Sequence, residues 1–67
     1  MHYKLADLNA MPTIKQGQFA NLKVETPTTR VWLSRCTRAD GEPYNNKVTI
    51  EKFTGGRWFT AAEYEAL

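Results

Sequence analysis

Cysteine and histidine are almost absent from this chain, which has one of each among its 67 residues. A single cysteine forms no internal disulfide, and one cysteine with one histidine gives too few ligands for a zinc site. We therefore expect no metal and no cofactor, and a reducing compartment suits the chain. Catalysis by a Cys36–His2 pair is not expected, because nothing in the sequence holds the two side chains together. These absences predict a protein that is not an enzyme.

Long apolar runs are absent as well. No segment approaches the roughly 20 apolar residues that span a membrane. The opening MHYKLADLNAMP has no long apolar core of the kind found in signal peptides. A glycine-rich phosphate loop is also missing, since Gly55-Gly56 lies between two strand-like segments rather than between a strand and a helix. We expect a cytoplasmic protein without a membrane partner.

Charge of either sign is modest. Nine Lys and Arg residues against seven Asp and Glu residues give a net charge of +2. Nucleic-acid-binding domains usually carry a denser basic surface, so this charge permits nucleic-acid binding without favouring it. The hydrophobic content of 42% and the aromatic content of 12% are those of a folded domain. A domain this small has a stability of only a few kcal/mol, roughly, unless a staple or partner adds to it.

Alternation of apolar and polar residues with a period of two is the main pattern in the chain, and it is typical of β-strands. It occurs in Phe19–Thr26, Thr29–Thr37 and Lys47–Phe53, and a further strand follows Gly55-Gly56. We predict a mainly β fold, as a four-stranded antiparallel meander in sequence order or a small open barrel, after a short N-terminal helical turn. The chain forms one domain in this prediction, with residues 1–17 as a lead-in segment, 18–61 as the sheet and 62–67 as a tail.

The double glycine Gly55-Gly56 predicts a two-residue hairpin loop, because such loops need positive φ and glycine adopts it without strain. The resulting register sets Phe53 opposite Trp58, a cross-strand aromatic pair that contributes about 0.2–1 kcal/mol. The segment TAAEYEAL after it opens with a capping-box pattern, so a short helix and a continued strand are both open there. We favour the strand.

The alternation also assigns side chains to two faces. The first face is aliphatic and is the predicted core; it carries Ala20, Leu22, Val24, Val31, Leu33, Val48, Ile50 and Phe59. The second carries Trp32, Cys36, Phe53 and Trp58 among polar residues. Large aromatic side chains are mostly buried in folded proteins, and the N-terminal segment or curling of the sheet would cover them. The alternative is an exposed interaction surface, since Trp and Arg are enriched at interface hot spots.

The segment RADGEPYNN, residues 38–46, is rich in polar and turn-forming residues. Its oxygen ligands are spaced poorly for a calcium-binding loop. We interpret it as a long connection with turns at Asp40-Gly41 and Asn45-Asn46. Because the connection is longer than a tight hairpin requires, a recognition loop with Tyr44 at its crest is the alternative.

The stretch from Thr29 to Tyr64 includes RVWLSR, ADGEPYNNKVTIE and a following GRW. In these parts the chain resembles small uncharacterised proteins encoded by bacteriophages and related mobile elements. No activity is established for that group, so the resemblance transfers no functional residue to this chain. It implies a bacterial host cytoplasm as the place of action, and a host-takeover or counter-defence role for a chain that binds a host target.

Two hypotheses of function from different classes follow. The first is a non-enzymatic, phage-type β module that binds a host or phage protein through Trp32, Tyr44, Trp58, Arg35, Arg38 and Arg57. The second is a β face that binds single-stranded nucleic acid through Lys23, Arg30, Trp32, Lys47, Phe53 and Trp58, with bases stacked on the aromatic rings. A minor structural component of a phage is a third reading. Exposed edge strands would in addition allow a homodimer by strand pairing.

Overall fold

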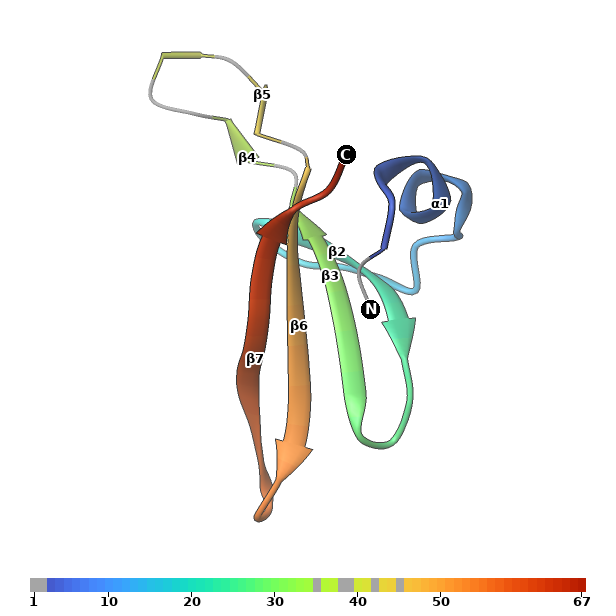
Figure 1. The fold of residues 1–67 in the computed structure, drawn as a ribbon, viewed down its shortest axis with the longest axis vertical. Coiled ribbons are helices and arrows are strands. Elements are labelled where there is room, and N and C mark those ends of the chain that lie inside the picture. The colour runs from blue at the N-terminus through green and yellow to red at the C-terminus, as the bar shows by residue number, and fades with distance from the viewer. Residues whose placement is uncertain (1–2, 35, 38–39, 42, 45) are drawn as a thin grey trace.

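The computed structural model describes residues 3–34, 36–37, 40–41, 43–44 and 46–67, and for 36–37 and 43–44 it describes the backbone. Five antiparallel strands form one open sheet in the order β1-β2-β3-β6-β7 (Figure 1). The sheet strands are β1 (Lys15–Gln16), β2 (Ala20–Glu25), β3 (Thr29–Ser34), β6 (Lys47–Thr54) and β7 (Arg57–Glu65). Helix α1 (Leu5–Ala10) precedes the strands, and a ribbon of β4 (Cys36–Thr37) and β5 (Pro43–Tyr44) connects β3 to β6.

The predicted mainly β fold and its meander of four strands in sequence order are confirmed by β2, β3, β6 and β7. The short strand β1 is an addition at one edge. It forms because the backbone N–H of Ile14 donates to the carbonyl of Leu22 at 2.8 Å, and the N–H of Gly17 donates to that of Ala20 at 2.8 Å. The lead-in segment is therefore folded back onto β2 as a tight hairpin.

The N-terminal helical turn is also confirmed. Helix α1 ends at Ala10, and Met11 is extended with φ −78° and ψ 142°. Pro12 explains this end, because the ring of a proline disfavours helical backbone in the residue before it. In the described residues no helix has the length and the apolar character that crossing a membrane requires.

The hairpin between β6 and β7 turns at the double glycine, as the sequence predicts. Gly55 and Gly56 have φ of 62° and 85°, which other residues adopt only with strain. The register sets Phe53 opposite Trp58, and the two ring centroids are 5.3 Å apart with their planes tilted by 54°. This separation lies in the range of favourable aromatic pairs.

Strand β7 continues to Glu65, through the segment where the capping-box pattern also allowed a short helix. Tertiary contacts explain the choice of strand, since Ala66 is only 2% exposed and packs beside Leu8. The backbone N–H of Ala66 also donates to the carbonyl of Asn46 at 2.8 Å. A helix of about seven residues is only marginally stable by itself, so these contacts of the extended strand outweigh it.

The core lies between α1 and one face of the sheet. Its buried members are Leu8, Val31, Leu33, Val48 and Ala66, with Tyr3, Leu5, Met11, Val24, Ile50 and Tyr64 packed around them. Leu8, Val31 and Val48 have no exposed surface. Each such side chain contributes roughly 1.5–3 kcal/mol through burial. The prediction of an aliphatic first face is thus confirmed for β3 and for the start of β6.

The prediction for β2 is confirmed for Val24 and wrong for Ala20 and Leu22, because a β-bulge lies between Leu22 and Val24. Leu22 pairs with Trp32, whereas Val24 pairs with Val31. Cross-strand partners share a face, so the extra residue between them moves Leu22, and Ala20 with it, onto the face of Trp32. Leu22 is 2% exposed there. The sheet consequently buries apolar side chains on both faces at its β1–β2 end.

Phe59 also departs from the prediction that it belongs to the core. It pairs with Lys52, so it shares the face of Ile50 as expected, but 44% of its surface is exposed. The β3–β6 ladder ends at the pair Thr29 and Lys52. Phe59 therefore lies at the margin of the sheet on its edge strand, where no neighbouring strand or helix covers it within the described part of the chain.

Candidate functional site

The end of the β6–β7 hairpin extends from the sheet (Figure 1). We call residues 52–59 the hairpin tip, and it projects beyond the turn between β2 and β3 (Figure 1). Phe53 and Phe59 are exposed by 41% and 44%, and Trp58 is half-buried. Phe53 and Trp58 lie on the face of Trp32, which we call the aromatic face, whereas Phe59 lies on the core face. The tip thus presents an aromatic side chain on each side.

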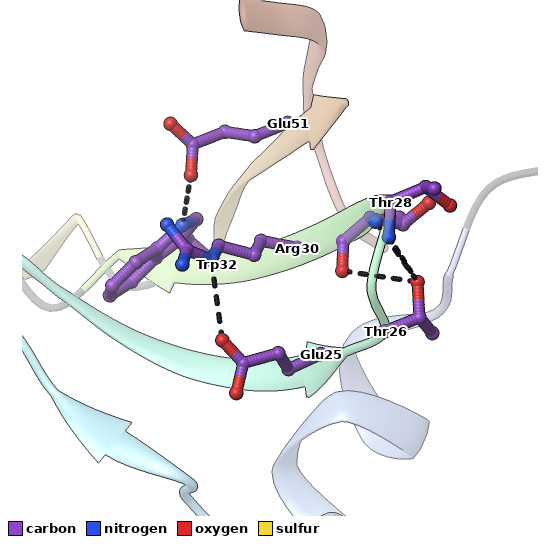
Figure 2. A network of polar contacts seen from close by, with 7 residues as sticks. Glu25, Thr26, Thr28, Arg30, Trp32 and Glu51 are labelled. Atoms are coloured by element: carbon purple, nitrogen blue, oxygen red, sulfur yellow. Dashed lines mark hydrogen bonds and ion pairs between the residues drawn. The ribbon is translucent and has the colours of Figure 1, made fainter. Parts of the chain in front are cut away.

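Arg30 joins the aromatic face to the tip. Its Cζ atom lies 4.0 Å from the centroid of the Trp58 ring, in the arrangement of a cation–π contact. Its Nε atom donates to Oε2 of Glu25, the residue opposite it on β2, at 3.3 Å (Figure 2). The guanidinium group is therefore held by the ring of one strand and the carboxylate of another.

The turn between β2 and β3 supports this arrangement. The Thr26 hydroxyl accepts hydrogen bonds from the backbone N–H groups of Thr28 at 3.3 Å and Thr29 at 2.9 Å (Figure 2). A threonine at the first position of a turn commonly makes such bonds, and they fix the loop. Because the turn is fixed, Glu25 and Arg30 are set opposite each other on the two strands that leave it.

Trp32 is held more tightly than the aromatic residues of the tip. Its Nε1–H donates to Oε1 of Glu51 at 2.6 Å (Figure 2). Its ring lies close to Gly17, where an added Cβ atom would come within 3.2 Å of Cζ3. The β1–β2 hairpin thus covers part of Trp32. The predicted cover by the N-terminal segment is therefore made by its end at Gly17. The apolar residues Tyr3, Leu5 and Leu8 of that segment do not cover Trp32, since they pack against the core on the opposite face.

The basic residues of the nucleic-acid hypothesis do not all gather on the aromatic face. Lys23 is the bulge residue, and its Nζ donates to the carbonyl of Met11 at 3.1 Å and to the Thr13 hydroxyl at 3.0 Å. Met11 packs against the core, so Lys23 is held away from the aromatic rings. Lys47 does lie on the aromatic face, where its Nζ is 3.2 Å from Oε2 of Glu63.

The residues of the protein-binding hypothesis are also divided. Trp32 and Trp58 share the aromatic face, but the Arg57 side chain lies on the other side of the tip, with its Cζ atom 4.9 Å from the Phe59 ring centroid. Tyr44 is placed on β5 by its backbone pairing with Cys36. Arg35 and Arg38 lie outside the described residues. The surface that the structure assembles is therefore centred on Arg30, Phe53 and Trp58.

Sequence reasoning missed the roles of Glu25 and Phe59. A four-residue turn at Thr26–Thr29 puts Glu25 opposite Arg30, so the turn signal was sufficient to find that pair. The double-glycine register likewise places Arg57 and Phe59 two residues apart on one face. What the register did not reveal is that Phe59 lies past the end of the core.

The core face has an open hollow of about 380 Å³ next to the tip, lined by residues that include Tyr3, Val31, Ile50, Lys52 and Ala62. The hollow brings together no pair of groups suited to acid–base or nucleophilic chemistry. Among the described residues, no cluster of three or more His, Cys, Asp or Glu side chains could hold a metal ion. The hairpin tip, by contrast, carries exposed aromatic and basic side chains.

Comparison with known proteins adds no relative to this description: no protein-family model, no curated protein and no solved structure matches the chain.

Proposed function

We propose that this protein is a non-enzymatic binding module that contacts another protein through its hairpin tip and through Arg30, the residue of the aromatic face that lies over Trp58. The observation that carries the proposal is the exposure of Phe53, 41%, beside Trp58 on a hairpin that projects from the sheet. Tryptophan and arginine dominate the binding energy of many protein interfaces. Aromatic side chains are also enriched there relative to the rest of the surface.

The order of this surface supports the same proposal. The double-glycine turn sets the Phe53–Trp58 pair, and Glu25 with Trp58 holds Arg30. Ordering a flexible side chain on binding costs about 0.5–1.5 kcal/mol, and this cost is smaller for side chains that are already held. The tip is therefore suited to a partner with a complementary groove.

Single-stranded nucleic acid, the second hypothesis, has less support. Lys23 is engaged with Met11 and Thr13, and Lys47 is paired with a carboxylate. Glu25, Glu51 and Glu63 lie on the same face as the aromatic rings. Their negative charges oppose the phosphate backbone that supplies most of the affinity in nucleic-acid binding.

The resemblance to small phage-encoded proteins extends the proposal to the kind of partner. It supports a host protein in a bacterial cytoplasm as the target, in a host-takeover or counter-defence role. A minor structural part of a phage particle is the alternative within the same resemblance. In both cases the contact is made by a protein surface and involves no catalysis by this chain.

Affinity capture from a bacterial lysate tests the proposal when three baits are compared. These are the natural chain, Phe53→Ser and Phe19→Ser; Phe19 is also exposed, by 64%, but lies between β1 and β2 rather than at the tip. We expect the natural chain and Phe19→Ser to recover the same protein and Phe53→Ser to lose it. Recovery of the bait alone in all three cases contradicts the proposal.

Titration with a short labelled oligonucleotide at low and high salt tests the second hypothesis. Tight binding that weakens steeply with added salt would favour nucleic acid over a protein partner. We expect no binding at low salt, since the aromatic face carries the acidic side chains named above.

A further inference from the structure

The guanidinium group of Arg30 has unused hydrogen-bonding capacity. Its Nε–H is taken by Glu25, and one face of the group lies over Trp58. Within the described part of the chain, its two terminal nitrogens have no hydrogen-bond acceptor. The side chain is 34% exposed, so these nitrogens are accessible to a partner.

An arginine held in this way is well suited to a carboxylate. Guanidinium nitrogens form a planar fork that matches the two oxygens of a carboxylate, and such paired bonds are stronger than bonds between neutral groups. Glu25 and Trp58 fix the fork before any partner arrives. Binding at this position therefore needs little further ordering of the protein.

The charge of the hairpin tip points to the same chemistry. The tip contains Lys52 and Arg57 and no acidic residue. The Nζ of Lys52 donates to the Thr29 hydroxyl at 2.9 Å, and Arg57 lies over Phe59. Neither contacts a carboxylate in the described part of the chain, whereas Lys47 at the other end of β6 is paired with Glu63. The tip therefore carries two positive charges that no carboxylate of the described residues neutralises.

We propose that the protein partner presents an acidic segment to the tip, with one carboxylate bound by Arg30 and an adjacent apolar side chain packed on Phe53. This inference rests on the proposed function and names the chemistry of the partner. An acidic peptide fits better than nucleic acid, because Glu25 and Glu51 lie opposite Arg30 on the two neighbouring strands and repel a row of phosphates more strongly than a single carboxylate.

Selection from a library of random short peptides displayed on a carrier tests this inference. The natural chain, Arg30→Gln and Lys15→Gln serve as baits; Lys15 is exposed on β1 and is the matched loss of one charge far from the tip. We expect the natural chain and Lys15→Gln to enrich peptides with Asp or Glu next to an aliphatic or aromatic residue. Binding of those peptides to Arg30→Gln should be weaker by roughly ten- to a hundredfold.

Arg30→Lys refines the test, because lysine keeps the charge and lacks the planar fork. We expect its affinity for the selected peptides to fall between those of the natural chain and Arg30→Gln. Equal affinity of Arg30→Lys and the natural chain would contradict recognition by the fork.

The remaining outcomes separate the two proposals. For this purpose Phe53→Ser is added as a fourth bait. If neutral or basic peptides are enriched, and their binding is lost in Phe53→Ser but kept in Arg30→Gln, the acidic partner is overturned and the protein-binding function stands. If Phe53→Ser enriches the same peptides as the natural chain, both the acidic partner and the binding function of the hairpin tip are overturned. Salt-sensitive binding of a short oligothymidine that Arg30→Gln abolishes overturns the acidic partner in favour of nucleic acid.

Discussion

Arg30 lies over the indole ring of Trp58, with 4.0 Å from its Cζ atom to the ring centroid, although β6 separates the strands that carry the two residues. The contact reaches across the central part of the sheet to the edge strand β7. It therefore links the projecting hairpin to the strand that carries the core residue Val31. The same pair of side chains supports the tip and belongs to the proposed contact surface.

The stability of the pair can be measured with a double-mutant cycle. We expect Arg30→Gln and Trp58→Ala to be less destabilising together than the sum of their separate effects, with a coupling free energy of about 0.5–1 kcal/mol. Urea denaturation of the natural chain and the three variants gives this value. Strict additivity would show that the contact contributes nothing to folding.

Gly17 is a position where even one methyl group should be harmful. A Cβ atom there would lie 2.8 Å from the carbonyl oxygen of Ala20 and 3.2 Å from the Trp32 ring. We expect Gly17→Ala to destabilise the fold by about 1–3 kcal/mol, as overpacking usually does. The control is Gln16→Ala on the exposed strand β1. Thermal unfolding, followed by tryptophan fluorescence, measures the difference. Equal unfolding temperatures for Gly17→Ala and Gln16→Ala would contradict this account.

Leu8 is the one fully buried residue that α1 contributes to the core. Leu8→Ala should destabilise the protein by about 2–5 kcal/mol, because it removes buried methyl groups and leaves a cavity. A domain of this size has a total stability of similar magnitude, so we expect a largely unfolded chain. Leu8→Met, which conserves volume, should remain folded by circular dichroism. A native spectrum for Leu8→Ala would show that α1 is not needed for the fold.

The double glycine should tolerate asparagine better than valine. Gly55 has φ of 62° in the left-handed region, which asparagine adopts more readily than β-branched residues. We expect Gly55→Asn to lower the free energy of unfolding by less than about 1 kcal/mol and Gly55→Val by more. Chemical denaturation of both variants measures the difference, and equal effects would argue against the positive-φ turn.

The parts of the fold that depend on neighbouring residues could be predicted from the sequence. The register around Gly55-Gly56 is an example, because a two-residue turn fixes which residues face each other. It gave the Phe53–Trp58 pair directly. The core positions Val31 and Val48 followed in the same way from alternation within their own strands.

The bulge in β2 could not be read from the chain, because contacts distant in sequence determine it. Lys23, the extra residue, is held by Met11 and Thr13, whose positions depend on where α1 packs. The bond from Trp32 to Glu51 was hidden for a related reason. It depends on the register of β3 with β6, and the long connection between these strands does not fix that register.

The most direct test of a binding surface at the hairpin tip uses the two indole N–H signals in a proton–nitrogen NMR spectrum. The chain has two tryptophans, and the N–H of Trp32 is bonded to Glu51 within the protein. During titration with a peptide selected by the natural chain, we predict that the Trp58 signal moves progressively and the Trp32 signal stays in place. Movement of the Trp32 signal with an unchanged Trp58 signal would contradict the account.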